Sequence, residues 1–107
     1  MGNFGRFNGG QPNMQALMRQ AQKMQEEAMQ AQKEVEESEV EGTASNGLVS
    51  VVMNGNKDVT SVTINPDIVD PDDIEMLEDL IVVALNDASS KIEEIKKQKM
   101  GKFGGLI

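Results

Sequence analysis

The sequence predicts an α+β fold in which a long helix, a three-stranded antiparallel meander and a second long helix follow one another. Three observations predict it. Apolar residues recur with heptad spacing through residues 14–35. Asn-Gly turns then separate short segments rich in Val, Thr and Ile. Finally, an Asp-Pro pair precedes a second long segment with helical apolar spacing.

The first helix is predicted to begin near Asn13, whose side chain can cap a helix N-terminus. Its apolar residues alternate at spacings of three and four, which is the a/d stripe of a heptad repeat. Several of them are Ala, so a neighbouring element could approach closely. The stripe consists of Met14, Leu17, Ala21, Met24, Ala28, Ala31 and Val35.

The predicted meander depends on two turns. Asn46-Gly47 separates the first two strands, and Asn-Gly is the strongest signal for a two-residue hairpin loop. A second turn around Asn54-Gly55 precedes the third strand, and the two later strands are rich in residues that favour β-structure. The predicted strands are residues 39–45, 48–54 and 58–65.

The middle strand is apolar on both faces. Alternation places Val49, Val51 and Met53 on one face, and Leu48 and Val52 on the other. Both faces of this strand are therefore expected to need cover.

The second helix has strong signals at both ends. Asp70 is its predicted cap and Pro71 its first residue, and each favours a helix start. The helix is expected to run to about Met100 and to end at Gly101. Its main stripe consists of Ile74, Leu77, Ile81, Ala84, Leu85, Ala88, Ile92 and Ile95.

A second apolar face on this helix predicts a partner chain. Met76 and Val83 lie off the main stripe, and one small sheet cannot bury both faces. We therefore expect an intertwined or tightly packed homodimer with projecting helical arms. Asn86 either forms a hydrogen bond across that interface or faces water. The predicted interface residues are Met76, Leu80, Val83 and Asn86.

The two ends of the chain differ in composition from its middle. Residues 1–12 are rich in Gly and Asn and residues 101–107 in Gly, so both are predicted to be flexible tails. Residues 13–100 are predicted to form a single domain. The three Phe residues of the tails either stack on nucleic-acid bases or cap the apolar seams of the helix ends, and we favour the second role.

Charge is distributed unevenly. The net charge is −8, yet residues 1–25 and 95–107 contain no acidic residue, and all 18 acidic residues lie between them. A helix of about 27 residues is about 40 Å long, roughly twice the length of a short strand, so its acid-free half should overhang the sheet. Phosphates would be attracted to the basic ends and repelled by the acidic middle, although Lys-rich termini can also simply be solvated.

The residues predicted to contact a nucleic acid, DNA or RNA, lie in these two ends. Basic side chains would contact phosphates, and Gln15 and Gln22 would reach base edges, where Gln can pair with adenine. The full predicted set is Arg6, Gln15, Arg19, Gln22, Lys23, Lys96, Lys97, Lys99 and Lys102.

The composition argues against an enzyme. The chain has no His and no Cys, which removes the commonest general base and the commonest zinc ligands. The acidic residues from Asp70 to Glu75 lack the Gly and the distant Glu of a calcium-binding loop, and helix-start acids explain them. We therefore expect no catalytic residue, metal, cofactor or small-molecule substrate. No segment is apolar and long enough to cross a membrane, so a cytoplasmic location is expected.

The chain resembles the YbaB/EbfC family of bacterial nucleoid-associated DNA-binding proteins. The resemblance is carried by MRQAQKMQEEAMQAQKEV, GLVSVVMNGNKDVTSVTINP and, most specifically, DPDDIEMLEDLIVVALNDASSKIEE. It covers nearly the whole chain. The resemblance implies a homodimer of tweezer-like outline, double-stranded DNA binding through helical arms, a place in the nucleoid, and no catalysis.

Two functions follow from these patterns and from the resemblance. The first is a homodimeric DNA-binding protein of the nucleoid, with a role in chromosome organisation or gene expression. The alternative is a protein–protein adaptor in replication or recombination that uses its heptad helix without binding DNA. Salt distinguishes them, because phosphate contacts weaken steeply as salt rises and an apolar helix interface does not.

Overall fold

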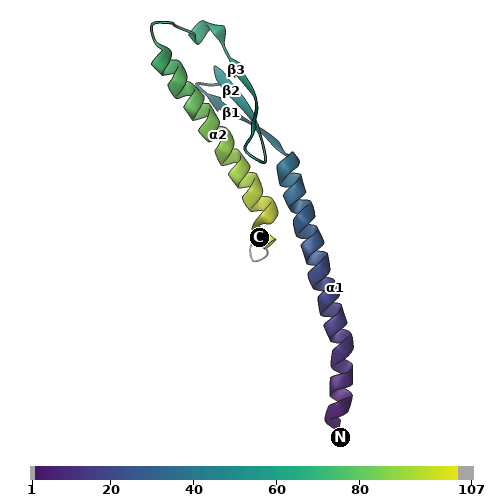
Figure 1. Cartoon of the computed structure of the whole chain (residues 1–107). Coiled ribbons are helices and arrows are strands. Elements are labelled where there is room, and N and C mark those ends of the chain that lie inside the picture. Colours follow the sequence, from purple (N-terminus) through teal and green to yellow (C-terminus); the bar gives the residue numbers. More distant parts are fainter. Residues whose placement is uncertain (1, 104–107) are drawn as a thin grey trace.

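The computed structural model describes residues 2–103 and confirms the predicted order of helix, meander and helix. The molecule is elongated, with extents of 89 × 17 × 16 Å, because α1 projects far beyond the sheet (Figure 1). The elements are α1 (Gly2–Glu37), β1 (Glu39–Ala44), β2 (Val49–Asn54), β3 (Val59–Ile64), η1 (Pro66–Ile68), α2 (Ile74–Met100) and η2 (Gly101–Phe103).

The three strands form one antiparallel sheet in the order β1-β2-β3, as predicted. The first turn differs from the prediction. Ala44 pairs with Val49, which leaves a loop of residues 45–48 rather than a two-residue turn at Asn46-Gly47. Ser45, Asn46 and Gly47 all have positive φ in this loop. Leu48 belongs to the loop, so its predicted position on a strand face is wrong.

One face of β2 forms the core. Val49, Val51 and Met53 are buried beneath α2, as their alternation predicted. The opposite face carries Val52 between polar residues of all three strands and is only half-buried. Leu48 is absent from the second face and its remaining residues are mostly polar, so this face is less apolar than the sequence suggested. Its cover stays a prediction.

α2 packs directly on the backbone of β1. Ala84, Ala88 and Ile92 are buried on the side of the helix that faces the sheet. A Cβ placed on Gly42 would lie 2.2 Å from the carbonyl oxygen of Ala84, so no other residue fits there without moving the helix. Small residues on both elements bring helix and strand into close contact.

The start of α2 lies three residues later than the sequence predicted. Asp73 caps the helix, since its carboxylate accepts a hydrogen bond of 3.2 Å from the backbone N–H of Met76. Asp70 instead accepts from the N–H of Asp72 at 2.9 Å and closes the preceding turn, which contains Pro71. The predicted end at Met100 is confirmed, but Gly101 has a right-handed conformation and the chain continues into η2.

The start of α1 also differs from the prediction. The helix begins at Gly2 rather than near Asn13, although residues 2–12 include four Gly and one Pro. Extending an existing helix needs no new nucleus, which offsets the low helix propensity of these residues. The predicted flexibility of the N-terminal tail stays a prediction.

The C-terminal tail is partly ordered into the fold. Phe103 in η2 is only 3% exposed, which agrees with a packing role for this ring. Residues 101–103 of the predicted tail form η2, and the predicted flexibility of this tail stays a prediction. Residues 104–107 lie outside the described part of the chain.

α1 and α2 pack against each other along one half of α1. Ala28 and Val35 are buried on α1, and Met100 is buried at the end of α2. Lys99 forms an ion pair of 3.4 Å with Glu34 across this contact. α2 ends beside the middle of α1 (Figure 1), so the preceding half of α1 projects alone.

Candidate nucleic-acid interface

The projecting part of α1, residues 2–25, contains no acidic residue, and we call it the arm. Every described side chain of the arm, from Asn13 onward, is exposed. Among the described residues, Arg19 and Lys23 form no ion pair, so both charges are available to a ligand. The side chain of Arg6, a third predicted contact, lies outside the described residues.

The predicted contacts on the arm share one face of the helix. At 100° per residue, Gln15, Arg19, Gln22 and Lys23 fall within about a third of a turn. This polar face is opposite the apolar stripe that begins with Met14. The structure thus brings four of the predicted DNA contacts together on a surface that no other part of the chain covers.

The second basic end does not form a projecting arm. The sequence placed Lys96, Lys97, Lys99 and Lys102 beyond the packed part of α2, but this end of the helix lies against α1 (Figure 1). The connection after β3 sends α2 back along the sheet toward α1, which sequence reasoning did not anticipate. As a result, the Lys-rich end adjoins the base of the arm, and both basic segments lie toward the same end of the molecule.

The lysines of this end are not equally available. Lys99 is held by Glu34, and the Lys102 ammonium lies 4.9 Å from the centroid of the Phe103 ring. Lys96 and Lys97 make no ion pair among the described residues. Lys96 and Lys97 line a groove with Val35 of α1, so they lie on the side of α1 that carries the apolar stripe rather than on the polar face of the arm.

A groove between α1, α2 and the β2–β3 turn has mixed charge. Its volume is about 720 Å³. Glu36, Glu93 and Glu94 line it together with Lys96 and Lys97. Lys57 of the nearby turn pairs with Glu93 at 2.5 Å and lowers the pKa of that carboxyl. The carboxylates make the groove itself a poor phosphate site.

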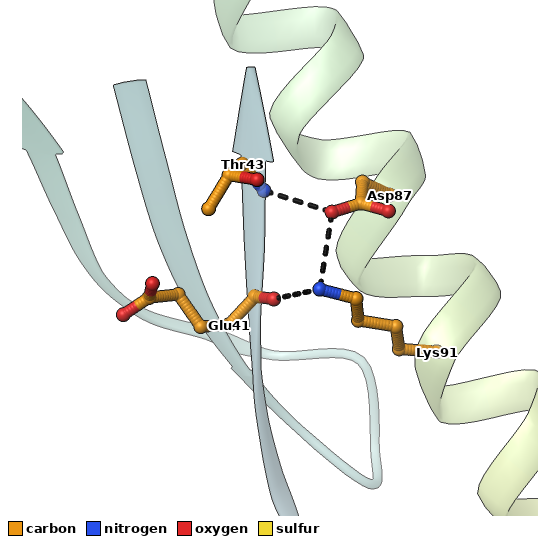
Figure 2. A network of polar contacts seen from close by, with 4 residues as sticks. All are labelled: Glu41, Thr43, Asp87 and Lys91. Carbon is orange, nitrogen blue, oxygen red and sulfur yellow. Dashed lines mark hydrogen bonds and ion pairs between the residues drawn. The ribbon is translucent and has the colours of Figure 1, made fainter. Parts of the chain in front are cut away.

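A polar network fastens α2 to the outer edge of β1 (Figure 2). Asp87 accepts a hydrogen bond of 2.9 Å from the Thr43 N–H and pairs with Lys91 at 3.3 Å. Lys91 donates in turn to the carbonyl of Glu41 at 2.6 Å. These contacts occupy backbone groups that an edge strand would otherwise leave open to another strand.

Asp87 makes stability dependent on pH. The Thr43 N–H, and then Lys91, lower the pKa of Asp87 below its ordinary value of 3.8. A carboxyl whose pKa is lower in the folded state contributes stability above its unfolded pKa and loses it as pH falls through the folded value. We therefore expect Asp87→Asn to lower the melting temperature at pH 7, by an amount that shrinks below about pH 4.

The control for this prediction is Asp79→Asn on the same helix. Asp79 is exposed, so its replacement should change the melting temperature little at either pH. The measurement is thermal unfolding by circular dichroism from pH 7 to pH 2. A difference between wild type and Asp87→Asn that stays constant over this range would contradict the role assigned to the network.

The face of the sheet beneath α2 is only partly covered. Val62 pairs with Val51 and points to the same face, yet Val51 is 0% exposed and Val62 48%. Val59 on the same strand is 44% exposed. α2 lies over β1 and β2 and leaves this apolar surface of β3 open. We call Val59 and Val62 the β3 face.

The four predicted interface residues lie in different surroundings. Met76 and Val83 are exposed, Leu80 is half-buried against the core of its own chain, and Asn86 is exposed. On the helix, Met76 and Val83 share the face of Asp87, which contacts Thr43 of β1, so they point away from the β3 face. Sequence reasoning missed the β3 face, because the sequence does not show which strands α2 covers.

Comparison with known proteins identifies the family. The model of the YbaB/EbfC DNA-binding family matches residues 10–107. This chain belongs to that family.

Curated relatives support the same assignment. A protein of Saccharopolyspora erythraea named nucleoid-associated protein is 50% identical over 99 residues, covering 92% of this chain and 85% of its own length. A protein of Chloroflexus aurantiacus with the same name is 46% identical over 88% of this chain and 95% of its own length. The resemblance noted from the sequence is therefore confirmed, and the YbaB/EbfC family is one of DNA-binding proteins rather than enzymes.

A solved structure confirms the fold. An uncharacterized protein of Helicobacter pylori superposes on this YbaB/EbfC chain with a TM-score of 0.66 and 23% identity. The match covers 81% of this chain and 91% of the other. In the described part of the chain, no helix is both long and apolar enough to cross a membrane, and no cluster of acidic residues is suited to a metal ion.

Proposed function

We propose that this protein is a homodimer that binds double-stranded DNA in the bacterial nucleoid. The observation that carries the proposal is the arm, an exposed helix without acidic residues that extends beyond an acidic body. The family match and the names of the relatives support DNA as the partner and the nucleoid as the location.

The charge arrangement determines how DNA would lie. Arg19 and Lys23 would contact phosphates from the arm, and Lys96 and Lys97 would add positive potential at its base. The acidic residues of the sheet region would repel the duplex and keep it on the arm. Gln15 and Gln22 share the face of Arg19, so they would lie closest to base edges.

The homodimer is supported by apolar surface that one chain leaves uncovered. Two surfaces compete for this role: the β3 face and the sequence-predicted set of Met76, Leu80, Val83 and Asn86. We favour the β3 face, because it continues the buried core of the sheet and needs only a second element to cover it. Interfaces of permanent dimers resemble such a divided core.

Binding to random duplex DNA at rising salt tests this function. If about six phosphates are neutralised per dimer, the logarithm of affinity should fall against that of salt with a slope of about −5. A filter-binding or fluorescence-anisotropy titration at several salt concentrations measures this slope. Binding that is absent at low salt would contradict the function.

The adaptor function also has a specific observation in its favour. The apolar stripe of the arm is exposed, with Met14 at 66% and Leu17 at 63%, and an exposed heptad stripe is a surface for helix docking. An adaptor would capture its partner at high salt and would bind no DNA at low salt. The same titration therefore separates the two functions.

A further inference from the structure

The apolar stripe of α1 is buried along one part of the helix and exposed along the other. From Ala28 to Val35 the a and d positions face the α1–α2 contact, where both of these residues are buried. Toward the N-terminus the same positions continue as Met24, Ala21, Leu17 and Met14, beyond the end of α2, and there they are exposed. An existing helix–helix seam thus extends onto a part of α1 that has no helix beside it.

The position of this stripe leaves the proposed DNA surface free. Gln15, Arg19 and Lys23 lie on the opposite side of the arm, so a helix seated on the stripe would not displace a duplex. The positions that flank the stripe within the arm are Met18, Gln20 and Gln25, and none of them carries charge. Two arms could therefore meet stripe to stripe without placing like charges together.

We propose that the stripe of Met14, Leu17, Ala21 and Met24 joins the arm of one molecule to the arm of its neighbour when both are bound to DNA. The proposal rests on the proposed function, since DNA holds the neighbours. The part of the stripe from Met14 to Met24 spans less than two heptads, and apolar seams this short associate only weakly in water. Binding to one duplex raises the local concentration of arms, so contacts too weak to form in solution become populated. The consequence is cooperative coating of DNA.

A second copy fits this surface better than an unrelated helix for two reasons. The stripe already accepts a helix of this chain at its C-terminal half, with Ala residues that permit close approach. The arm also supplies a matching stripe of equal length on every neighbouring molecule, at the high density that a DNA lattice imposes.

The test compares two lengths of duplex. One chain is 89 Å long, so a duplex of about 25 base pairs, at about 3.4 Å each, is about as long as a single chain and leaves no room for a row of dimers. A duplex ten times longer holds a row. The variant is Met14→Gln with Leu17→Gln, which keeps helix propensity and changes residues already exposed. We expect unchanged affinity on the short duplex, and on the long duplex a loss of cooperativity with about tenfold weaker apparent affinity.

Met29→Gln is the matched control. Met29 is 70% exposed on the same helix but lies off the stripe, so cooperativity should be kept. The proposal is overturned if wild type binds the long duplex without cooperativity, or if the double variant stays cooperative. It is also overturned if the double variant loses affinity for the short duplex, since the stripe would then contact DNA or maintain the dimer. Wild type that binds neither duplex would show that the proposed function itself has failed.

Discussion

Replacing Val62 with Glu is expected to give a folded protein that no longer dimerises. Val62 is 48% exposed in the single chain, so a Glu there can reach water and costs the chain little beyond the lower β-propensity of Glu. In a dimer that covers the β3 face, the same carboxylate would be buried without a partner, at a cost of several kcal/mol. Dimer affinity should then fall by more than a hundredfold. Light scattering on a sizing column measures the mass, and circular dichroism checks the fold.

Val83→Glu is the matched comparison for this prediction. Val83 is 51% exposed, and the sequence placed it in the interface. If the dimer forms through the β3 face, Val83→Glu should remain dimeric. The opposite pattern, with Val83→Glu monomeric and Val62→Glu dimeric, would favour the interface predicted from the sequence.

The sequence predicts the elements of this fold well because their signals are local. The spacing of apolar residues from Ala28 to Val35 indicates a helix without knowledge of the rest of the fold. In the same way, the alternation of Val49 and Val51 indicates a strand with one buried face. The cap of α2 shows a limit of local signals, because they predicted Asp70 and the structure has Asp73. Asp70 and Asp73 are both good caps, and the turn around Pro71 decides between them only in the folded chain.

The candidate interface could be predicted only in part. The absence of acidic residues before Glu26 identifies the arm from composition alone. The position of Lys96 and Lys97 relative to α1 depends on the direction in which α2 returns along the sheet. No residue near them in the sequence indicates that direction. The exposure of Val62 likewise follows from the width of α2 relative to three strands, which is a property of packing rather than of sequence period.

Reversing the charges of Arg19 and Lys23 to Glu is expected to remove most DNA binding while leaving the fold intact. Both side chains are exposed and lie off the apolar stripe, and Glu is a comparable helix former. A dimer would lose four of about six phosphate contacts, so the salt slope should flatten from about −5 to about −2. Affinity at low salt should fall further, because the new carboxylates repel phosphates. Anisotropy titrations of a random duplex at several salt concentrations measure both effects.

A matched control for the arm lies on the same helix. Lys33 is two heptads along α1 from Arg19, so it occupies the same helix face but sits in the acidic half, beside Glu34. Arg19→Glu and Lys33→Glu change the net charge equally, yet only the first alters the arm. If charge acts through the arm, Arg19→Glu should weaken binding much more than Lys33→Glu, and Lys96→Glu with Lys97→Glu should weaken it in the same direction. Equal losses from Arg19→Glu and Lys33→Glu would mean that net charge alone matters. Undiminished affinity and slope in the Arg19→Glu, Lys23→Glu protein would mean that the arm does not hold DNA, and its exposed stripe would then favour the adaptor function.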